Sequence, residues 1–133
     1  MHAGGCLCGT IRYEVAGPLA PIQLCHCGQC RKAQGGPFAS NIPVEAAAFR
    51  LLRGAQSLKA FESSPGKRRW FCGSCGSPIY SALVSDPGVL RLRAGTLDGP
   101  VPSRPASQAF VGSKADWWEI TDDLPQHPAA RPG

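Results

Sequence analysis

The chain has 133 residues, 14 of them Lys or Arg and 9 acidic, and a formal net charge of +5. This length fits one ordinary domain with a buried core, so we expect a single domain over residues 1–133, with a loose, proline-rich tail over about 125–133. There is no apolar run near the roughly 18 residues that cross a bilayer and no leader with a basic and then an apolar region. We therefore expect no membrane partner and a cytoplasmic location.

Short strands separated by turns dominate the predicted secondary structure. Apolar and polar residues alternate at 11–15, as in a half-buried strand. Further strands are predicted at 38–42, 49–54, 58–63, 68–72, 78–84, 89–95 and 108–112, with Gly-, Pro- and Ser-rich turns between many of them. Helix is limited to one or two turns at 30–34, ending at Gly35, and another turn at 45–48. The pattern predicts a mainly β fold with very little helix.

The cysteines are the strongest chemical signal in the sequence. All seven fall into three tight groups: Cys6 and Cys8, then Cys25, Cys27 and Cys30, then Cys72 and Cys75. An odd number, close spacing and the lack of an export signal argue against a disulfide framework. A C-x-x-C turn directs two sulfurs to one point, and we expect Gly73 and Gly76 to adopt positive φ in such a turn. Sulfur-only ligation favours zinc over calcium or magnesium.

Spacing alone leaves the grouping of these ligands open. One partition joins the first and third groups into a closed four-thiolate site and leaves the middle group with three ligands and an open position, as in catalytic zinc sites. A rival partition joins the two C-x-x-C pairs, Cys27/Cys30 and Cys72/Cys75, and strands the other three cysteines. In a third arrangement, a distant residue or a partner protein completes the second site.

Five segments in order resemble the glutathione-dependent formaldehyde-activating enzyme family, which includes centromere protein V. They are residues 4–15, 25–36, 71–80, 93–98 and 113–125, so the resemblance spans roughly residues 4–126. It implies a β-tent of small antiparallel sheets stapled by zinc. It also implies the first partition, with structural zinc on Cys6, Cys8, Cys72 and Cys75 and catalytic zinc on Cys25, Cys27 and Cys30. Two zinc ions per chain are then expected, the second site being partly empty in some preparations.

The activity implied by the resemblance is the condensation of glutathione with formaldehyde to S-(hydroxymethyl)glutathione, a carbon–sulfur lyase reaction. The expected partners are a small-molecule thiol and an aldehyde, and a homo-oligomer is compatible with the sequence. This chain has Gln108 where family members often carry a histidine, which bears on the substrate. The alternative is a non-catalytic zinc-binding interaction module of the same fold.

Basic residues beside the cysteine motifs provide candidates for substrate binding. Arg31 and Lys32 follow the middle cysteine group, and Arg69 precedes the last one. Each can hold a substrate carboxylate, and Ser40 can line the pocket from the strand after the middle group. The basic residues form no long stripe interleaved with aromatic residues, so we expect no nucleic acid partner.

Overall fold

The computed structural model describes residues 1–130 and is mainly β. One sheet has three strands, in the order β1 (His2–Gly5), β2 (Arg12–Val15) and β5 (Phe49–Arg53). The other has seven, in the order β10 (Pro105–Ala109), β3 (Ile22–Cys25), β4 (Ala39–Glu45), β9 (Asp86–Arg93), β8 (Pro78–Leu83), β7 (Lys67–Cys72) and β6 (Leu58–Ser64). The α-helix is α1 (Gly28–Gln34), and short 3₁₀ turns lie at 46–48, 55–57, 94–96 and 111–113. No helix of residues 1–130 is long and apolar enough to cross a membrane.

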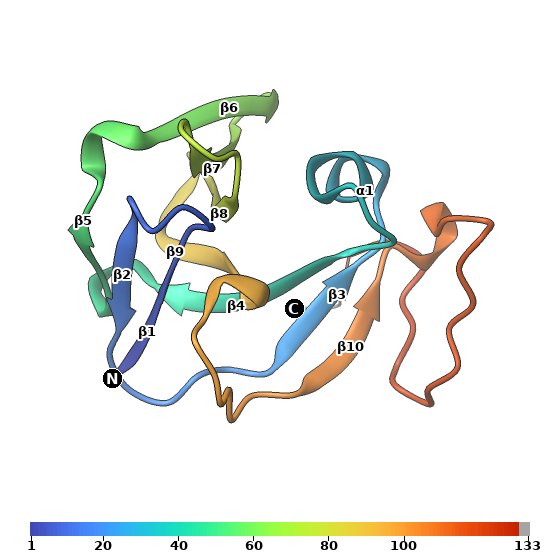
Figure 1. Ribbon diagram of the computed structural model, residues 1–133. Coiled ribbons are helices and arrows are strands. Elements are labelled where there is room, and N and C mark those ends of the chain that lie inside the picture. Colours follow the sequence, from blue (N-terminus) through green and yellow to red (C-terminus); the bar gives the residue numbers. More distant parts are fainter. Residues whose placement is uncertain (131–133) are drawn as a thin grey trace.

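In Figure 1, α1 lies at the end of the seven-stranded sheet that is formed by β3, β4 and β10. Neighbouring strands of this sheet pair antiparallel except β3 and β10, which pair in parallel, with Cys25 opposite Ala109. In Figure 1, β3 and β10 run side by side toward α1, and β6 to β9 lie on the other side of the molecule. This arrangement confirms the predicted β-tent, in which β3 and β10 form one arm of the long sheet and β6 to β9 form the other.

Alternation along β4 and β9 gives the long sheet two different faces. Ile42 and Leu92 pair in register and are fully buried against the three-stranded sheet. The next residues along, Asn41 and Arg93, also pair but point to the opposite face, because successive side chains on a strand alternate. One face of the long sheet therefore contributes to the hydrophobic core, and the other face carries polar and basic groups.

Most predicted strands are present, with two omissions and one shift. Strands β1 and β3 were not predicted, and each is only four residues long. The strand predicted at 108–112 is found at 105–109. It ends at Ala109 because Phe110 has a left-handed conformation, with φ of 56°.

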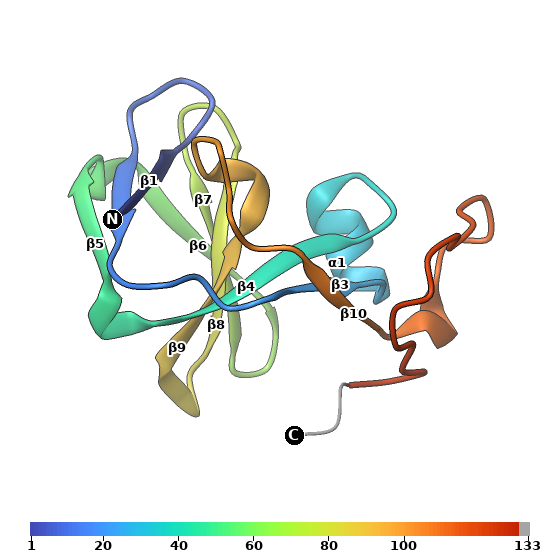
Figure 2. The same cartoon turned by 90° about the horizontal axis from the view of Figure 1, so that it is seen from below.

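The segment expected to be a loose tail is ordered over much of its length. Backbone hydrogen bonds join Gln108 to Pro125 and His127, and Phe110 to Ala129. The chain therefore folds back along the end of β10, as Figure 2 shows. The prediction of a loose tail was wrong for residues 125–129, and residues 131–133 lie outside the described part of the chain.

The buried hydroxyl of Tyr13 provides a test of the core. It donates a 2.6 Å hydrogen bond to Thr96 Oγ1, whose own hydroxyl donates to the carbonyl of Arg93. Burial raises the pKa of Tyr13 to about 12. A tyrosine in the unfolded chain ionises near pH 10, so folding holds this proton and stability falls as pH rises through the interval between the two values.

We expect Tyr13→Phe to be less stable than the wild type by about 1 kcal/mol near pH 8, through loss of the hydrogen bond. The wild type should then lose up to about 1.4 kcal/mol per pH unit relative to the variant above about pH 10. Urea denaturation at several pH values measures both effects. A difference that stays constant up to about pH 11 would contradict the assigned burial.

Candidate metal centres and active site

Two loops bring four sulfur atoms together at one end of the molecule. Cys6 and Cys8 lie in the turn between β1 and β2, whereas Cys72 ends β7 and Cys75 lies in the turn between β7 and β8. The sulfurs of this four-cysteine cluster all lie within 4.8 Å of one another. The backbone N–H of Leu7 also donates to Ser77 Oγ, which links the two loops directly.

The two glycines of the second loop have different tasks. Gly76 has a φ of +81°, as predicted for this turn. Gly73 lacks positive φ, so that part of the prediction was wrong. Instead, Gly73 avoids a close contact, because a Cβ there would lie 2.9 Å from Lys59 Cγ. Its backbone N–H also donates to the carbonyl of Ser57. The loop is thus packed against the residues before β6.

Local hydrogen bonds favour the thiolate form of part of the four-cysteine cluster. The Ser77 hydroxyl lowers the pKa of Cys75 to about 5, and Thr10 lowers that of Cys8. Burial raises the pKa of Cys72. Metal ligation by cysteine requires thiolates, so these contacts prepare two of the four ligands.

The spacing of the sulfurs fits a tetrahedral metal ion. Zinc–sulfur bonds of about 2.3 Å in a tetrahedron separate the sulfurs by about 3.8 Å. The Cys6–Cys8 and Cys8–Cys72 separations are 3.6 and 3.9 Å. A closed four-thiolate zinc site is therefore compatible with the geometry as well as with the donor set.

A second cluster, the three-cysteine cluster, forms where β3 meets α1. Cys25 ends β3, Cys27 is the N-cap of α1, and Cys30 lies in its first turn. Cys27 Sγ accepts the backbone N–H of Cys30, and the Cys25 and Cys30 sulfurs are 3.2 Å apart. These sulfurs also lie within 4.8 Å of one another, and residues 1–130 bring no fourth Cys, His, Asp or Glu to them.

The thiols of the three-cysteine cluster differ in acidity. Hydrogen bonds from the neighbouring thiols lower the pKa of Cys27, and the contact with Cys27 raises that of Cys25. Cys27 is therefore the more acidic of the two in the metal-free protein.

Two buried arginines lie next to the three-cysteine cluster. The guanidinium of Arg69 lies 3.7 and 3.8 Å from Cys30 Sγ through its two terminal nitrogens, and its Nε donates to Ser63. Arg93 donates to Asn41 and Gln34, and burial lowers its pKa to about 10. No salt bridge among residues 1–130 includes either arginine. Cys30 lies within reach of Arg69, and its thiolate form would offset the cost of that buried charge.

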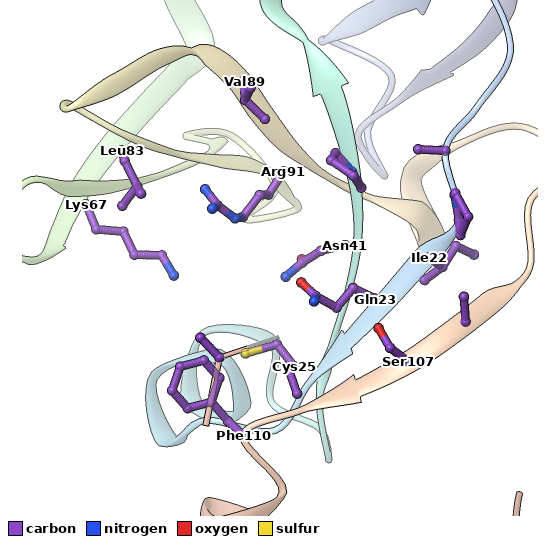
Figure 3. Close-up of a pocket in the computed structure, with 16 residues that line it drawn as sticks. Ile22, Gln23, Cys25, Asn41, Lys67, Leu83, Val89, Arg91, Ser107 and Phe110 are labelled. Atoms are coloured by element: carbon purple, nitrogen blue, oxygen red, sulfur yellow. The ribbon is translucent and has the colours of Figure 1, made fainter. Parts of the chain in front are cut away.

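A cavity of about 500 Å³ adjoins the three-cysteine cluster (Figure 3). Cys25 and Phe110 line one side, and Lys67 and Arg91 extend into the cavity from the opposite side. The remaining walls carry small or apolar residues together with amide and hydroxyl groups, and none of the acidic residues among 1–130 lines it. The cluster therefore opens onto a volume that suits a small molecule.

The residues predicted to bind substrate are distributed differently around the cluster. Arg31 and Lys32 lie on α1, outside the cavity lining, and Lys32 is exposed. Ser40 also lies outside the lining, because it is adjacent to Asn41 on β4 and faces the other way. Arg69 lies against Cys30 rather than in the cavity.

Sequence reasoning did not select Arg91 or Phe110 as site residues. Lys67 and Arg91 belong to strands whose alternation was visible, but the identity of the face that meets the cysteines depends on strand pairing over long sequence distances. No local pattern marks Phe110, whose position depends on the end of β10.

A buried chain of hydrogen bonds links the three-cysteine cluster to the C-terminal segment. His26 lies between two of the cysteines and is fully buried. Its Nε2 lies 2.6 Å from Gln108 Oε1, and Gln108 Nε2 donates to Asp122 at 2.9 Å. Because a glutamine oxygen can only accept, His26 carries a proton on Nε2. Gln108 therefore positions the loop that carries the cysteines.

Comparison with known proteins agrees with this picture. The family model described as glutathione-dependent formaldehyde-activating enzyme matches residues 1–113. An uncharacterised lyase of Schizosaccharomyces pombe is 22% identical over 121 residues, covering 91% of this chain and 86% of the relative. A crystal structure of a Rhodobacter sphaeroides protein aligns with a TM-score of 0.64 and 25% identity, covering 78% of this chain and 99% of that one.

We expect Gln108→Leu to destabilise the protein by about 1–3 kcal/mol, because it leaves buried His26 without its partner. Urea denaturation measures the change. Gln56→Leu, the same substitution at an exposed position, is the control and should change stability by less than about 0.5 kcal/mol. Equal effects of the two substitutions would show that the hydrogen-bond chain does not hold the loop.

Proposed function

Because the chain belongs to the glutathione-dependent formaldehyde-activating enzyme family, we propose that it is a zinc-dependent carbon–sulfur lyase-type enzyme. In this proposal it joins a thiol, glutathione, to formaldehyde or a related small aldehyde. The lyase name of the Schizosaccharomyces pombe relative is in keeping with this class of reaction.

We assign two zinc ions to each chain. Cys6, Cys8, Cys72 and Cys75 would hold a structural ion, and Cys25, Cys27 and Cys30 a catalytic one. The donor set supports zinc at both clusters, since every ligand is a sulfur atom, and the sulfur separations in the four-cysteine cluster suit a tetrahedron. When bound at the three-cysteine cluster, zinc supplies stabilisation of a substrate thiolate at neutral pH.

One observation carries the proposal: a three-sulfur cluster that lacks a fourth ligand among residues 1–130 adjoins a cavity through Cys25. A structural site needs no such access, whereas a catalytic site keeps one position for substrate. A non-catalytic interaction module remains the alternative, but the cavity of about 500 Å³ next to the sulfurs favours catalysis.

The side chains around the cluster suit addition of a thiol to an aldehyde. In the overall reaction a carbon–sulfur bond forms, the carbonyl π bond breaks, and the thiol hydrogen is transferred to the carbonyl oxygen. Arg69 and Arg93 place positive charge beside the cluster and so favour thiolates there. Phe110 and Ala109 line the cavity beside Cys25 and limit the access of water. Confinement of both reactants in one cavity supplies proximity.

The activity is tested by exchange NMR of glutathione with formaldehyde, which measures formation of S-hydroxymethylglutathione with and without protein. The zinc-loaded protein should accelerate exchange above the uncatalysed rate, and Cys27→Ser should reduce this acceleration at least about tenfold. A thermal melt of Cys27→Ser verifies that the variant is folded. Equal exchange rates with wild type, folded Cys27→Ser and no protein would exclude this substrate pair.

The contribution of Arg69 is tested by zinc release to a chromogenic chelator. The wild type should contain about two zinc ions per chain and release them in two phases, the faster from the three-cysteine cluster. Arg69→Met removes the charge beside Cys30 and should accelerate the fast phase about tenfold. Arg68→Met, on the exposed side of the same strand, is the control and should leave both phases unchanged. If Arg69→Met changed the slow phase of zinc release and left the fast phase unchanged, the assignment of the fast phase to the three-cysteine cluster would be wrong.

A further inference from the structure

Four basic side chains lie on one face of the seven-stranded sheet. Lys67 and Arg69 lie two residues apart on β7, and Arg91 and Arg93 lie two residues apart on β9. Side chains two residues apart on a strand share a face. Strand β8 lies between these strands, and Ser81 pairs in register with both Arg69 and Arg91, so the two pairs face the same side.

The inner and outer members of this group have different surroundings. Arg69 and Arg93 are buried, and their guanidinium groups contact sulfur, hydroxyl and amide groups. Lys67 and Arg91 line the cavity instead, and none of the salt bridges among residues 1–130 includes either one. Their polar neighbours in the lining are the uncharged groups of Gln23, Asn41 and Ser107.

We propose that Lys67 and Arg91 form an anion subsite that holds the carboxylate of the thiol substrate, with the substrate sulfur on the Cys25 side of the same cavity. Figure 3 shows the two basic groups directed into the cavity, opposite Cys25 and Phe110. A ligand that fits has a sulfur at one end and an anionic group at the other. The thiol half of this inference rests on the proposed function; the anion subsite does not.

Electrostatics favours an anion at this position. Burial and the nearby charge of Arg69 lower the pKa of Lys67, while the thiolates of the three-cysteine cluster act in the opposite direction. Neither Lys67 nor Arg91 belongs to a salt bridge among residues 1–130, so a carboxylate between these two half-buried cations offsets the cost of their partial burial. The planar guanidinium of Arg91 can donate two parallel hydrogen bonds to a carboxylate, while Lys67 acts as a point charge. Amide and hydroxyl groups in the lining can satisfy remaining lone pairs.

The subsite is tested first with probes that have no free thiol. In NMR titrations of zinc-loaded, ¹⁵N-labelled protein, 3-(methylthio)propionate should bind at least about tenfold more tightly than 3-(methylthio)propanol, which has the same shape without the charge. The amide signals of Gln23, Cys25 and Ser107 should shift. Raising the ionic strength should weaken binding of the propionate and leave that of the alcohol unchanged.

Variants then identify the residues responsible. Lys67→Gln and Arg91→Gln should each reduce the preference for the propionate over the alcohol about tenfold, or abolish that preference where it is smaller. The dissociation constants of the double variant for the two probes should agree within about twofold. Arg68→Gln carries the same loss of charge on the same strand, but its side chain is exposed and pairs with Glu62 outside the cavity. It should keep the wild-type preference. Should the double variant fail to fold, the single variants and the salt dependence still decide the question.

Different results separate this inference from the proposed function. Tight, Lys67- and Arg91-dependent binding of the propionate without turnover of any thiol supports the subsite and rejects the proposed reaction. Turnover of 3-mercaptopropionate and 2-mercaptoethanol with equal kcat/KM, together with equal binding of the two thioether probes, rejects the subsite and keeps the reaction. Preference for the positively charged thiol cysteamine, or a propionate preference that survives in the double variant, also overturns the subsite.

Discussion

Two guanidinium groups buried on one face of the seven-stranded sheet, one of them beside a cysteine sulfur, set the central constraint on this molecule. Arg69 contacts Cys30, and Arg93 lies on the same face of the sheet, where burial lowers its pKa. A buried positive charge is costly unless a negative group lies close to it. Neutral thiols cannot meet this requirement, whereas thiolates can, and thiolates in turn favour a cation among them. The basic face of the sheet and the three-cysteine cluster therefore stabilise each other.

The four-cysteine cluster fixes the geometry on which this arrangement depends. It joins the turn after β1 to the turn after β7, which are more than 60 residues apart in sequence. A metal ion held there only by the folded form would close this long loop and so contribute to stability. The four-cysteine cluster also positions β7, which carries Arg69 and Lys67. One cluster thus organises the strands that provide the surroundings of the other.

Sequence patterns predicted the local chemistry better than its surroundings. The two cysteine groupings are confirmed as spatial clusters, because ligand spacing and the family resemblance are both carried by short motifs. The basic residues chosen beside the motifs, Arg31 and Lys32, do not line the cavity, whereas Lys67 and Arg91 do. Proximity in sequence was a poor guide there, since the wall opposite Cys25 is built by strand pairing between distant segments. The ordered tail was missed for the same reason: its hydrogen bonds are made to β10 and have no local signature.

The left-handed conformation of Phe110 has a consequence for redesign of the cavity. A bulky side chain at positive φ is strained by about 1–3 kcal/mol, and the surrounding fold must hold it in place. Most substitutions that enlarge a binding site reduce stability, because they remove packing. At position 110 a glycine would remove the ring beside Cys25 while also relieving the backbone, so the two effects oppose each other. The cavity can therefore be widened at this position with a smaller loss of stability than the lost packing alone would cause.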